Sequence, residues 1–270
     1  MTKKIGLALG GGAGLGWAHI GVINCLSDHN IHPDYIAGTS IGAIVGACLA
    51  AGKMKEVELV ARKMTVKELL ALGQFGFRKG AFLGTEKIER ELRGHLGEMN
   101  FDSLETSFSA IAADLYTSER VELTEGDVVS AVLASAAVPG VFPPVKLGEN
   151  TLIDGGVVDP LPCESLHRMG AEYIIAVDLQ GDYTGRLSKL GLTKETPVRA
   201  KAMKTARASL FIMMKQIGQE RLQRFPADLV ITPKVGHVEM ADFTKAEELI
   251  QLGYEETEKQ IFSLIKIAAE

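Results

Sequence analysis

The sequence predicts an α/β fold built on a mainly parallel sheet, and the order of elements near its start indicates this. The apolar runs Ile5–Leu9 and Tyr35–Ala37 are short and end at turns, as buried parallel strands do. Helical periodicity follows each run, over Gly16–Leu26 and Ile41–Ala51. Strands that alternate with helices are typical of parallel sheets covered by helices on their faces.

The remainder of the chain continues this alternation. We expect helices at 54–72, 86–96, 128–136, 162–169 and 199–224, strands at 109–113, 120–123, 173–177 and 229–231, and a last helix from Thr244. No internal repeat, low-complexity tract or flexible linker is present, which predicts one domain over residues 1–270. Its chemical motifs lie at about 4–180, and 181–270 complete the fold.

Composition narrows the classes of protein that the chain can belong to. With 46% hydrophobic and 23% charged residues, its 270 residues are globular in composition. The formal net charge of −5 provides no broad basic surface, so we expect no nucleic-acid partner. Cys25, Cys48 and Cys163 are odd in number and widely spaced, which predicts buried, reduced thiols. No ligand-spaced cluster indicates a metal, and we expect no cofactor.

The N-terminal region needs separate treatment, because Lys3 and Lys4 precede a nearly uncharged stretch at 5–26. Such a pattern can be mistaken for a signal peptide or a membrane span. The many glycines of this stretch would weaken either kind of helix, and no cleavage site is evident. A strand, a glycine loop and a helix fit better, and we expect a cytoplasmic protein.

The sequence Gly38-Thr39-Ser40-Ile41-Gly42 places a serine between the second predicted strand and its helix. A nucleophile on such a tight turn has a strained backbone, and flanking glycines leave room for neighbouring chain. The N-terminal amides of the following helix favour developing negative charge. Ser40 is therefore a candidate nucleophile, and a simple helix N-cap is the alternative.

A glycine-rich loop, Gly10-Gly11-Gly12-Ala13-Gly14-Leu15-Gly16, directly follows the first strand. Successive amides without bulky side chains can converge on an anion. No register supplies the three glycines of a dinucleotide fingerprint, and Trp17-Ala18 replaces the Lys-Ser/Thr of a phosphate-binding loop. An oxyanion hole is the interpretation that remains.

A third feature, Asp154-Gly155-Gly156, follows the apolar pair Leu152-Ile153. Such a sequence alone is usually a turn. Here it follows the segment 134–144, ASAAVPGVFPP, and its two glycines would let a serine turn approach the carboxylate. Asp154 is therefore a candidate partner of Ser40.

In this order, the glycine loop, GTSIGA, ASAAVPGVFPPV and DGG resemble the motifs of the patatin-like phospholipase family, specifically its small bacterial members. The resemblance covers roughly residues 4–180. It implies a three-layer α/β/α fold related to the α/β-hydrolases, and lipid acyl hydrolysis by a Ser–Asp dyad without histidine. It assigns Ser40 as nucleophile and Asp154 as base. The oxyanion hole would be the amides around Gly11, Gly12 and Ala13, and the supporting glycines are Gly10, Gly14, Gly16, Gly38, Gly42, Gly155 and Gly156.

The chain departs from the family pattern at two positions of the glycine loop. Ala13 stands where the family has its second glycine, and Leu15 stands where it has a basic residue. The second change removes a positive charge near the site, so a preference for anionic headgroups does not follow.

The proton acceptor has two possible identities. An aspartate of ordinary pKa is a weak base, and burial in an apolar pocket would raise its basicity. A triad is the rival, and the chain order Ser, acid, His nominates His167 or His237. We expect both of these histidines to be solvated and His19 to be structural.

Two further segments bear on access to the site. Gly73–Gly84 contains three phenylalanines, and this pattern is typical of a mobile apolar flap or of a surface loop whose phenylalanines pack in the core. The predicted helix 199–224 has an apolar stripe (Ala202, Ala206, Leu210, Met213, Ile217) and a basic one (Lys201, Lys204, Arg207, Lys215). The pattern favours a core-packed apolar stripe with a solvated basic face, and weak membrane docking is the alternative.

These observations predict a serine hydrolase whose partner is a lipid or another acyl ester. A non-catalytic protein that binds an acyl ligand or a protein partner is the alternative. Oligomeric state is left open by the sequence.

Overall fold

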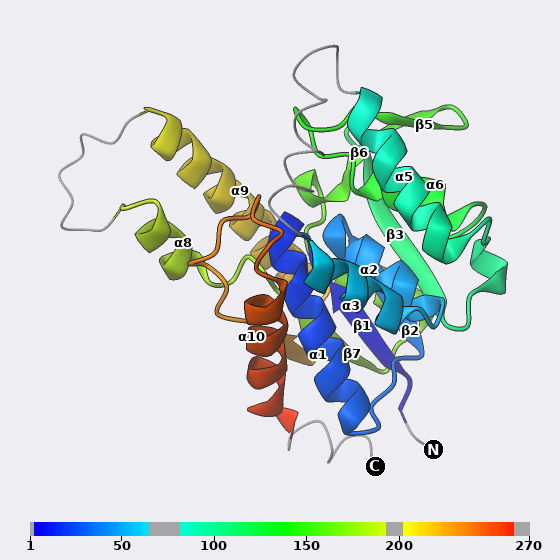
Figure 1. Cartoon of the computed structure of the whole chain (residues 1–270), viewed down its shortest axis with the longest axis horizontal. Helices are drawn as coiled ribbons and strands as arrows, with labels where there is room; N and C mark the ends of the chain where they lie inside the picture. Colours follow the sequence, from blue (N-terminus) through cyan, green and yellow to red (C-terminus); the bar gives the residue numbers. More distant parts are fainter. Residues whose placement is uncertain (1–2, 65–81, 193–201, 262–270) are drawn as a thin grey trace.

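A computed structural model describes residues 3–64, 82–192 and 202–261 of the chain. Its centre is an eight-stranded sheet in the order β5-β6-β3-β2-β1-β7-β8, with β4 also paired to β3 (Figure 1). The strands are β1 Ile5–Leu9, β2 Tyr35–Thr39, β3 Ser107–Asp114, β4 Arg120–Leu123, β5 Val145–Leu147, β6 Asn150–Asp154, β7 Tyr173–Val177 and β8 Leu229–Ile231.

Helices of the described residues alternate with these strands along the chain. They are α1 Trp17–Asp28, α2 Ile41–Ala50, α3 Met54–Lys63, α5 Phe82–Leu96, α6 Val128–Ser135, α7 Cys163–Met169, α8 Tyr183–Lys189, α9 Ala202–Arg224 and α10 Ala246–Glu258. Short 3₁₀ helices occur at Ala13–Gly16 (η1), Phe101–Ser103 (η2) and Gly155–Val157 (η3).

The sheet is mainly parallel, which confirms the fold class predicted from the sequence. Strands β8, β7, β1, β2 and β3 run parallel, whereas β4 and β6 are antiparallel to β3 and β5 is antiparallel to β6. Alternate residues of the central strands enter different apolar clusters: Leu7 and Leu9 lie in the larger one and Ala8 in the other. Helices α1, α2 and α10 contribute to the first cluster and α7 to the second, so both faces are covered.

The topology sets where a functional site can form. The loops after β1 and β2 leave the same edge of the sheet, because these neighbouring strands are parallel. Strand β3 aligns two distant segments: Thr39 pairs with Ile111, and Asp154 pairs with the next residue, Ala112. The ends of β2 and β6 therefore lie on either side of β3, beside two consecutive residues of that strand.

Helix α9 does not pack as the sequence pattern predicts. Leu210 and Met213, expected in the core, are 52% and 58% exposed, whereas Ala208 and Phe211 are buried. Apolar residues occur on more than one side of this helix, so periodicity did not identify the face that packs. Lys204 and Arg207 of the expected basic face are exposed, as predicted. They also contact the protein, since Lys204 donates to the Leu190 carbonyl and Arg207 pairs with Glu239. Lys201 lies outside the described residues.

Other differences concern the ends of elements. Helix α3 ends at Lys63, and residues 65–72 of the predicted helix lie outside the described residues. Residues 73–81 of the predicted flap also lie outside them, while its last three residues, 82–84, belong to helix α5. Helix α8 was not predicted.

The three cysteines lie inside the fold, as the sequence predicts. Cys25, Cys48 and Cys163 are buried and free, and burial raises the pKa of their thiols to about 11, about 12 and about 12. Within residues 3–64, 82–192 and 202–261, no helix has the length and apolar character needed to cross a membrane.

Candidate active site

Ser40 lies on a strained turn between β2 and α2. Its φ of 58° and ψ of −124° are unusual for a residue with a side chain, and such strain occurs at functional sites. Glycines make the turn possible, since a Cβ at Gly38 would lie 2.4 Å from the Gly42 carbonyl oxygen and one at Gly42 would lie 2.1 Å from that of Leu9. Ser40 occupies the N-cap position of α2, yet its side chain makes no capping hydrogen bond.

The Ser40 hydroxyl instead donates to Asp154. Oγ and Oδ2 are 2.5 Å apart, although 114 residues separate the two in the sequence. The other carboxylate oxygen accepts the Gly156 N–H at 2.7 Å. A Cβ at Gly155 would lie 2.2 Å from the Ile111 carbonyl oxygen, so glycine there lets β6 approach β3. The structure thus brings together the two side chains that the sequence nominates.

Burial makes Asp154 more basic than an ordinary aspartate. Both it and Ser40 are only 6% exposed. Desolvation raises the pKa of Asp154 to about 6, against the opposing hydrogen bonds from Ser40 and Gly156. No lysine or arginine of the described part of the chain forms an ion pair with it. The carboxylate is therefore ionised at neutral pH and has an enhanced affinity for a proton.

The C-terminal end of α6 holds the backbone of both residues. Ser135 Oγ accepts the Ser40 N–H at 2.9 Å and donates to the Ile111 carbonyl at 2.6 Å. Two residues later, the Ala137 carbonyl accepts the Asp154 N–H at 3.0 Å. Ser135 is not among the site residues predicted from the sequence, although it lies in the ASAAVPGVFPPV motif. A serine within an otherwise apolar helix end was the available signal.

The glycine loop lies beside Ser40 and has amides of two kinds. The Gly10, Gly11 and Gly14 N–H groups donate to the carbonyls of Val177, Pro160 and Met240, at 3.2, 2.9 and 2.7 Å. The Gly11 amide, one of the three expected in an oxyanion hole, is thus already engaged. A Cβ at Gly11 would lie 3.5 Å from that of Ser40, so the loop touches the nucleophile turn.

Two other amides of the loop remain available. In the part of the chain that the structure describes, the N–H groups of Gly12 and Ala13 have no acceptor, and we call them the unpaired amides. Ala13 has a φ of 49°, which few non-glycine residues adopt. The Ile41 N–H, in the first turn of α2, likewise has no intrahelical acceptor. These amides are therefore candidate donors for negative charge that develops near Ser40.

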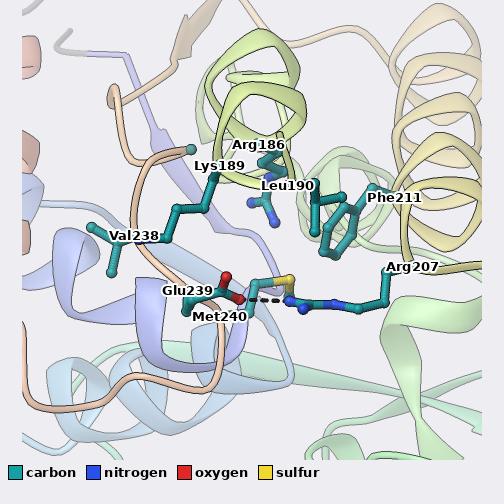
Figure 2. Close-up of a pocket in the computed structure, with 9 residues that line it drawn as sticks. Arg186, Lys189, Leu190, Arg207, Phe211, Val238, Glu239 and Met240 are labelled. Carbon is teal, nitrogen blue, oxygen red and sulfur yellow. Dashed lines mark hydrogen bonds and ion pairs between the residues drawn. The ribbon is translucent and has the colours of Figure 1, made fainter. Parts of the chain in front are cut away.

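Elements from the C-terminal part of the chain support the loop. Gly12 packs against Leu179, whose carbonyl accepts a hydrogen bond from the buried guanidinium of Arg186. Arg186 and Met240 also line a small pocket between α8 and α9, with Lys189, Arg207 and Phe211 (Figure 2). Burial lowers the pKa of Arg186 to about 10. The residues that line this pocket include neither Ser40 nor Asp154.

The remaining predicted glycines lie where close packing is needed. A Cβ at Gly16 would lie 2.1 Å from Ile41 Cγ1, so the end of the loop fits closely against the start of α2. The Gly156 N–H holds the Asp154 carboxylate, as described above.

No histidine of the described residues is hydrogen-bonded to Ser40 or Asp154. His19 is buried and hydrogen-bonded to the Gly10 carbonyl at 2.7 Å, and desolvation lowers its pKa to about 4. His167 bonds the Pro226 carbonyl, and His237 pairs with Glu248 at 2.7 Å. A search of the same residues finds no group of three or more His, Cys, Asp or Glu that could hold a metal ion.

A strained serine after a parallel strand, a buried carboxylate hydrogen-bonded to it and amides without acceptors are features typical of serine hydrolases. Comparison with known proteins narrows the class further. The model of the patatin-like phospholipase family matches residues 7–167, which is more than half of the chain. The chain belongs to the patatin-like phospholipase family, as its motifs predict.

Several relatives carry names from the NTE group. An uncharacterised NTE family protein of Mycobacterium bovis is 36% identical over 184 residues, which cover 68% of this chain and 51% of that protein. Lysophospholipase NTE1 of Pyricularia oryzae is 26% identical and aligns with 93% of this chain and 18% of its own length. The chain thus spans about half the length, or less, of these curated relatives.

Among solved structures, VipD from Legionella pneumophila is similar in fold. The superposition has a TM-score of 0.54 and covers 97% of this chain and 67% of VipD. At 12% sequence identity this likeness concerns the fold alone.

Proposed function

We propose that this protein hydrolyses acyl esters of lipids, with Ser40 as nucleophile and Asp154 as general base. The observation that carries the proposal is the 2.5 Å hydrogen bond from a hydroxyl on a strained turn to a buried carboxylate without a cation. Membership of the patatin-like phospholipase family supports a lipid substrate, as does similarity to a protein named lysophospholipase.

The proposed reaction has two halves. Ser40 Oγ attacks the ester carbonyl carbon while its proton passes to Asp154 Oδ2, and the unpaired amides stabilise the oxyanion. The tetrahedral intermediate then expels the alcohol, which takes the proton from Asp154 and leaves an acyl-enzyme. Water attacks this ester with Asp154 again as base, and collapse of the second intermediate releases the fatty acid and restores the Ser40 hydroxyl.

The basicity of Asp154 sets an expectation for the rate. A general base works best when its pKa is close to the working pH, and burial brings this carboxyl to about 6. It still holds a proton less strongly than the serine hydroxyl does. We therefore expect a slow or moderate hydrolase rather than a fast one.

The exposed side of α9 suits transient contact with a lipid surface, which we include in the proposal. Leu210, Ile212 and Met213 are exposed there, and the Met214 methyl lies 4.0 Å from where a Cβ of Gly156 would stand, so α9 adjoins the Asp154 segment. Leu210→Ser together with Met213→Ser should reduce co-sedimentation with phosphatidylcholine vesicles at both low and high salt. Binding that disappears with salt alone would point to charges instead.

The function is tested by labelling and turnover together. Wild type should react with a fluorophosphonate probe and hydrolyse members of a panel of p-nitrophenyl esters, phospholipids and lysophospholipids, whereas Ser40→Ala should do neither. Ser188→Ala changes an exposed serine of α8 and is the matched control. Failure of the probe to label folded wild type, with binding of acyl ligands retained, would instead favour the non-catalytic alternative. The cytoplasmic location and the single domain stay predictions.

A further inference from the structure

A second buried carboxylate lies five residues after Asp154 and has a different environment. Asp159 is fully buried at 0% exposure. Its Oδ2 accepts hydrogen bonds from Arg120 Nε of β4 at 2.7 Å and from Arg221 Nη2 of α9 at 3.0 Å. Two elements that are distant in sequence therefore converge on one carboxylate oxygen. The proposed reaction makes no direct use of this group.

The two arginines belong to a larger buried cluster. Arg221 also pairs with Glu164 of α7, and Arg120 also donates to the Ser165 hydroxyl and pairs with Glu122 at 3.3 Å. Buried ion pairs contribute little net stability, because desolvation offsets their attraction. Their geometry is nevertheless specific, since each arginine contacts more than one carboxylate and moving one group disturbs several ion pairs. Such a cluster can fix the position of a segment.

The segment at Asp159 touches both halves of the proposed active site through its backbone. The Asp159 carbonyl accepts the buried hydroxyl of Thr39, the residue before Ser40, at 2.8 Å. The next carbonyl, that of Pro160, accepts the Gly11 N–H at 2.9 Å. One short stretch of backbone thus holds the nucleophile turn and the loop that carries the unpaired amides.

We propose that Asp159, clamped by Arg120 and Arg221, is a positioning residue that sets the distance between Ser40 and the unpaired amides. The inference rests on the proposed function. Hydrogen-bond donors must lie where the oxyanion forms, and a displacement of about 1 Å can cost a hundredfold in rate. The hydrogen bond from Thr39 links the Asp159 carbonyl to the turn at Ser40, and the hydrogen bond from Gly11 links the Pro160 carbonyl to the loop that carries the unpaired amides. The position of Asp159 therefore affects both Ser40 and these amides.

Positioning and plain structural support make different predictions. If the cluster only stabilises the fold, its disruption reduces the amount of folded protein, and each active molecule keeps its rate. If the cluster positions the site, kcat per active molecule falls and KM changes little, because the misplaced donors act mainly in the transition state. Counting active sites with a fluorophosphonate, and dividing rate by that count, separates the two.

The most direct test changes the hydrogen bond between Thr39 and the Asp159 carbonyl. Thr39→Val keeps the branched shape and removes the hydroxyl, and we expect kcat per labelled site to fall about tenfold or more with KM nearly unchanged. Thr39→Ser retains a hydroxyl and should restore kcat toward the wild-type value. Thermal unfolding of both variants checks that the fold is intact.

The link to the arginine clamp is tested by a double-mutant cycle. Arg221→Gln should lower kcat per labelled site, and its effect should not add to that of Thr39→Val, since both act through the same carbonyl. Arg224→Gln removes an exposed ion pair of the same helix and is the matched control.

Two failures would be distinguishable. If wild type is labelled and hydrolyses esters, but kcat per site is unchanged in both Thr39→Val and Arg221→Gln, the positioning role is overturned and the proposed function stands. Fully additive effects of the two substitutions would likewise overturn the connection between clamp and turn. If wild type is neither labelled nor active, the proposed function fails and this inference fails with it.

Discussion

The segment 154–159 begins and ends with a buried aspartate, and the two aspartates have different hydrogen-bond partners. Asp154 accepts hydrogen bonds from a hydroxyl and a backbone amide, while Asp159 accepts them from two guanidinium groups. The first carboxylate is therefore costly to ionise, and burial raises its pKa to about 6. The second has positive charge at hydrogen-bond distance, although desolvation outweighs the two guanidinium groups and raises its pKa as well. The comparison suggests that one end of the segment is arranged for proton transfer and the other for holding shape.

The largest expected effect is the loss of activity when Asp154, at the first end of the segment, is changed. Asp154→Asn keeps the shape of the side chain and an oxygen for the Gly156 amide, but it removes the proposed base. We expect kcat to fall by about 10²–10⁴-fold, the range for loss of a general base. Steady-state hydrolysis of a p-nitrophenyl ester measures it, with Ser40→Ala as the reference for complete loss. Activity near the wild-type value would reject Asp154 as the base.

The same substitution at the other end should reduce stability, in addition to the fall in kcat per labelled site that the positioning role predicts. Asp159→Asn removes one carboxylate from Arg120 and Arg221, which keep their ion pairs with Glu122 and Glu164. We expect the free energy of unfolding to fall by about 1–3 kcal/mol, less than when a buried ion pair loses its only partner. Urea denaturation at neutral pH measures this change. Glu220→Gln breaks an exposed pair with Arg224 and is the control, with a loss of at most about 1 kcal/mol.

Asp154→Asn should change stability in the opposite direction. The pKa of Asp154 is about 6 in the folded protein, against 3.8 for an aspartate exposed to water, so the folded state binds this proton more tightly. Wild-type stability is then lost progressively as the pH rises from about 4 through about 6. At pH 8 the variant should be more stable than wild type, by up to about 3 kcal/mol.

Below about pH 4 both proteins carry an uncharged group at this position, and the difference should disappear. Urea denaturation of the two proteins across this pH range checks the prediction. A stability difference that does not depend on pH would mean that Asp154 is not desolvated as described.

The smallest expected effect concerns the histidines. His167→Gln and His237→Gln should leave kcat close to that of wild type, because neither ring is hydrogen-bonded to Ser40 or Asp154 in the structure. His237→Gln also removes an exposed pair with Glu248, which should cost at most about 1 kcal/mol of stability. A loss of activity from either substitution as large as that of Asp154→Asn would favour a triad.

Much of the fold is predictable from the sequence because local patterns agree with the tertiary structure. The apolar strands β1 and β2 and their helices α1 and α2 lie close to the predicted ranges, since each strand is buried on both faces. The family motifs also identify Ser40 and Asp154 as partners. Their proximity depends on the pairing of β2 and β6 with β3, and no local pattern in the sequence reveals that pairing.

Other features depend on contacts that a single sequence does not display. The packed face of α9 is set by its contacts with the Asp159 segment and with α8, and not by its most apolar stripe. Engagement of the Gly11 amide depends on the Pro160 carbonyl, which is distant in sequence. Ser135 and Asp159 are polar residues whose partners are visible only once the chain is folded.

The alignment of Thr39 and Asp154 beside Ile111 and Ala112 has a consequence for how the protein can diversify. The spacing of Ser40 and Asp154 follows from the pairing of β2 and β6 with the two edges of β3, where neighbouring strands lie about 4.8 Å apart, and not from the length of the chain between them. The tip of the turn at Tyr116, between β3 and β4, is exposed and can therefore vary without moving Ser40 or Asp154, provided that Asp114 keeps its hydrogen bond to the Thr151 amide of β6.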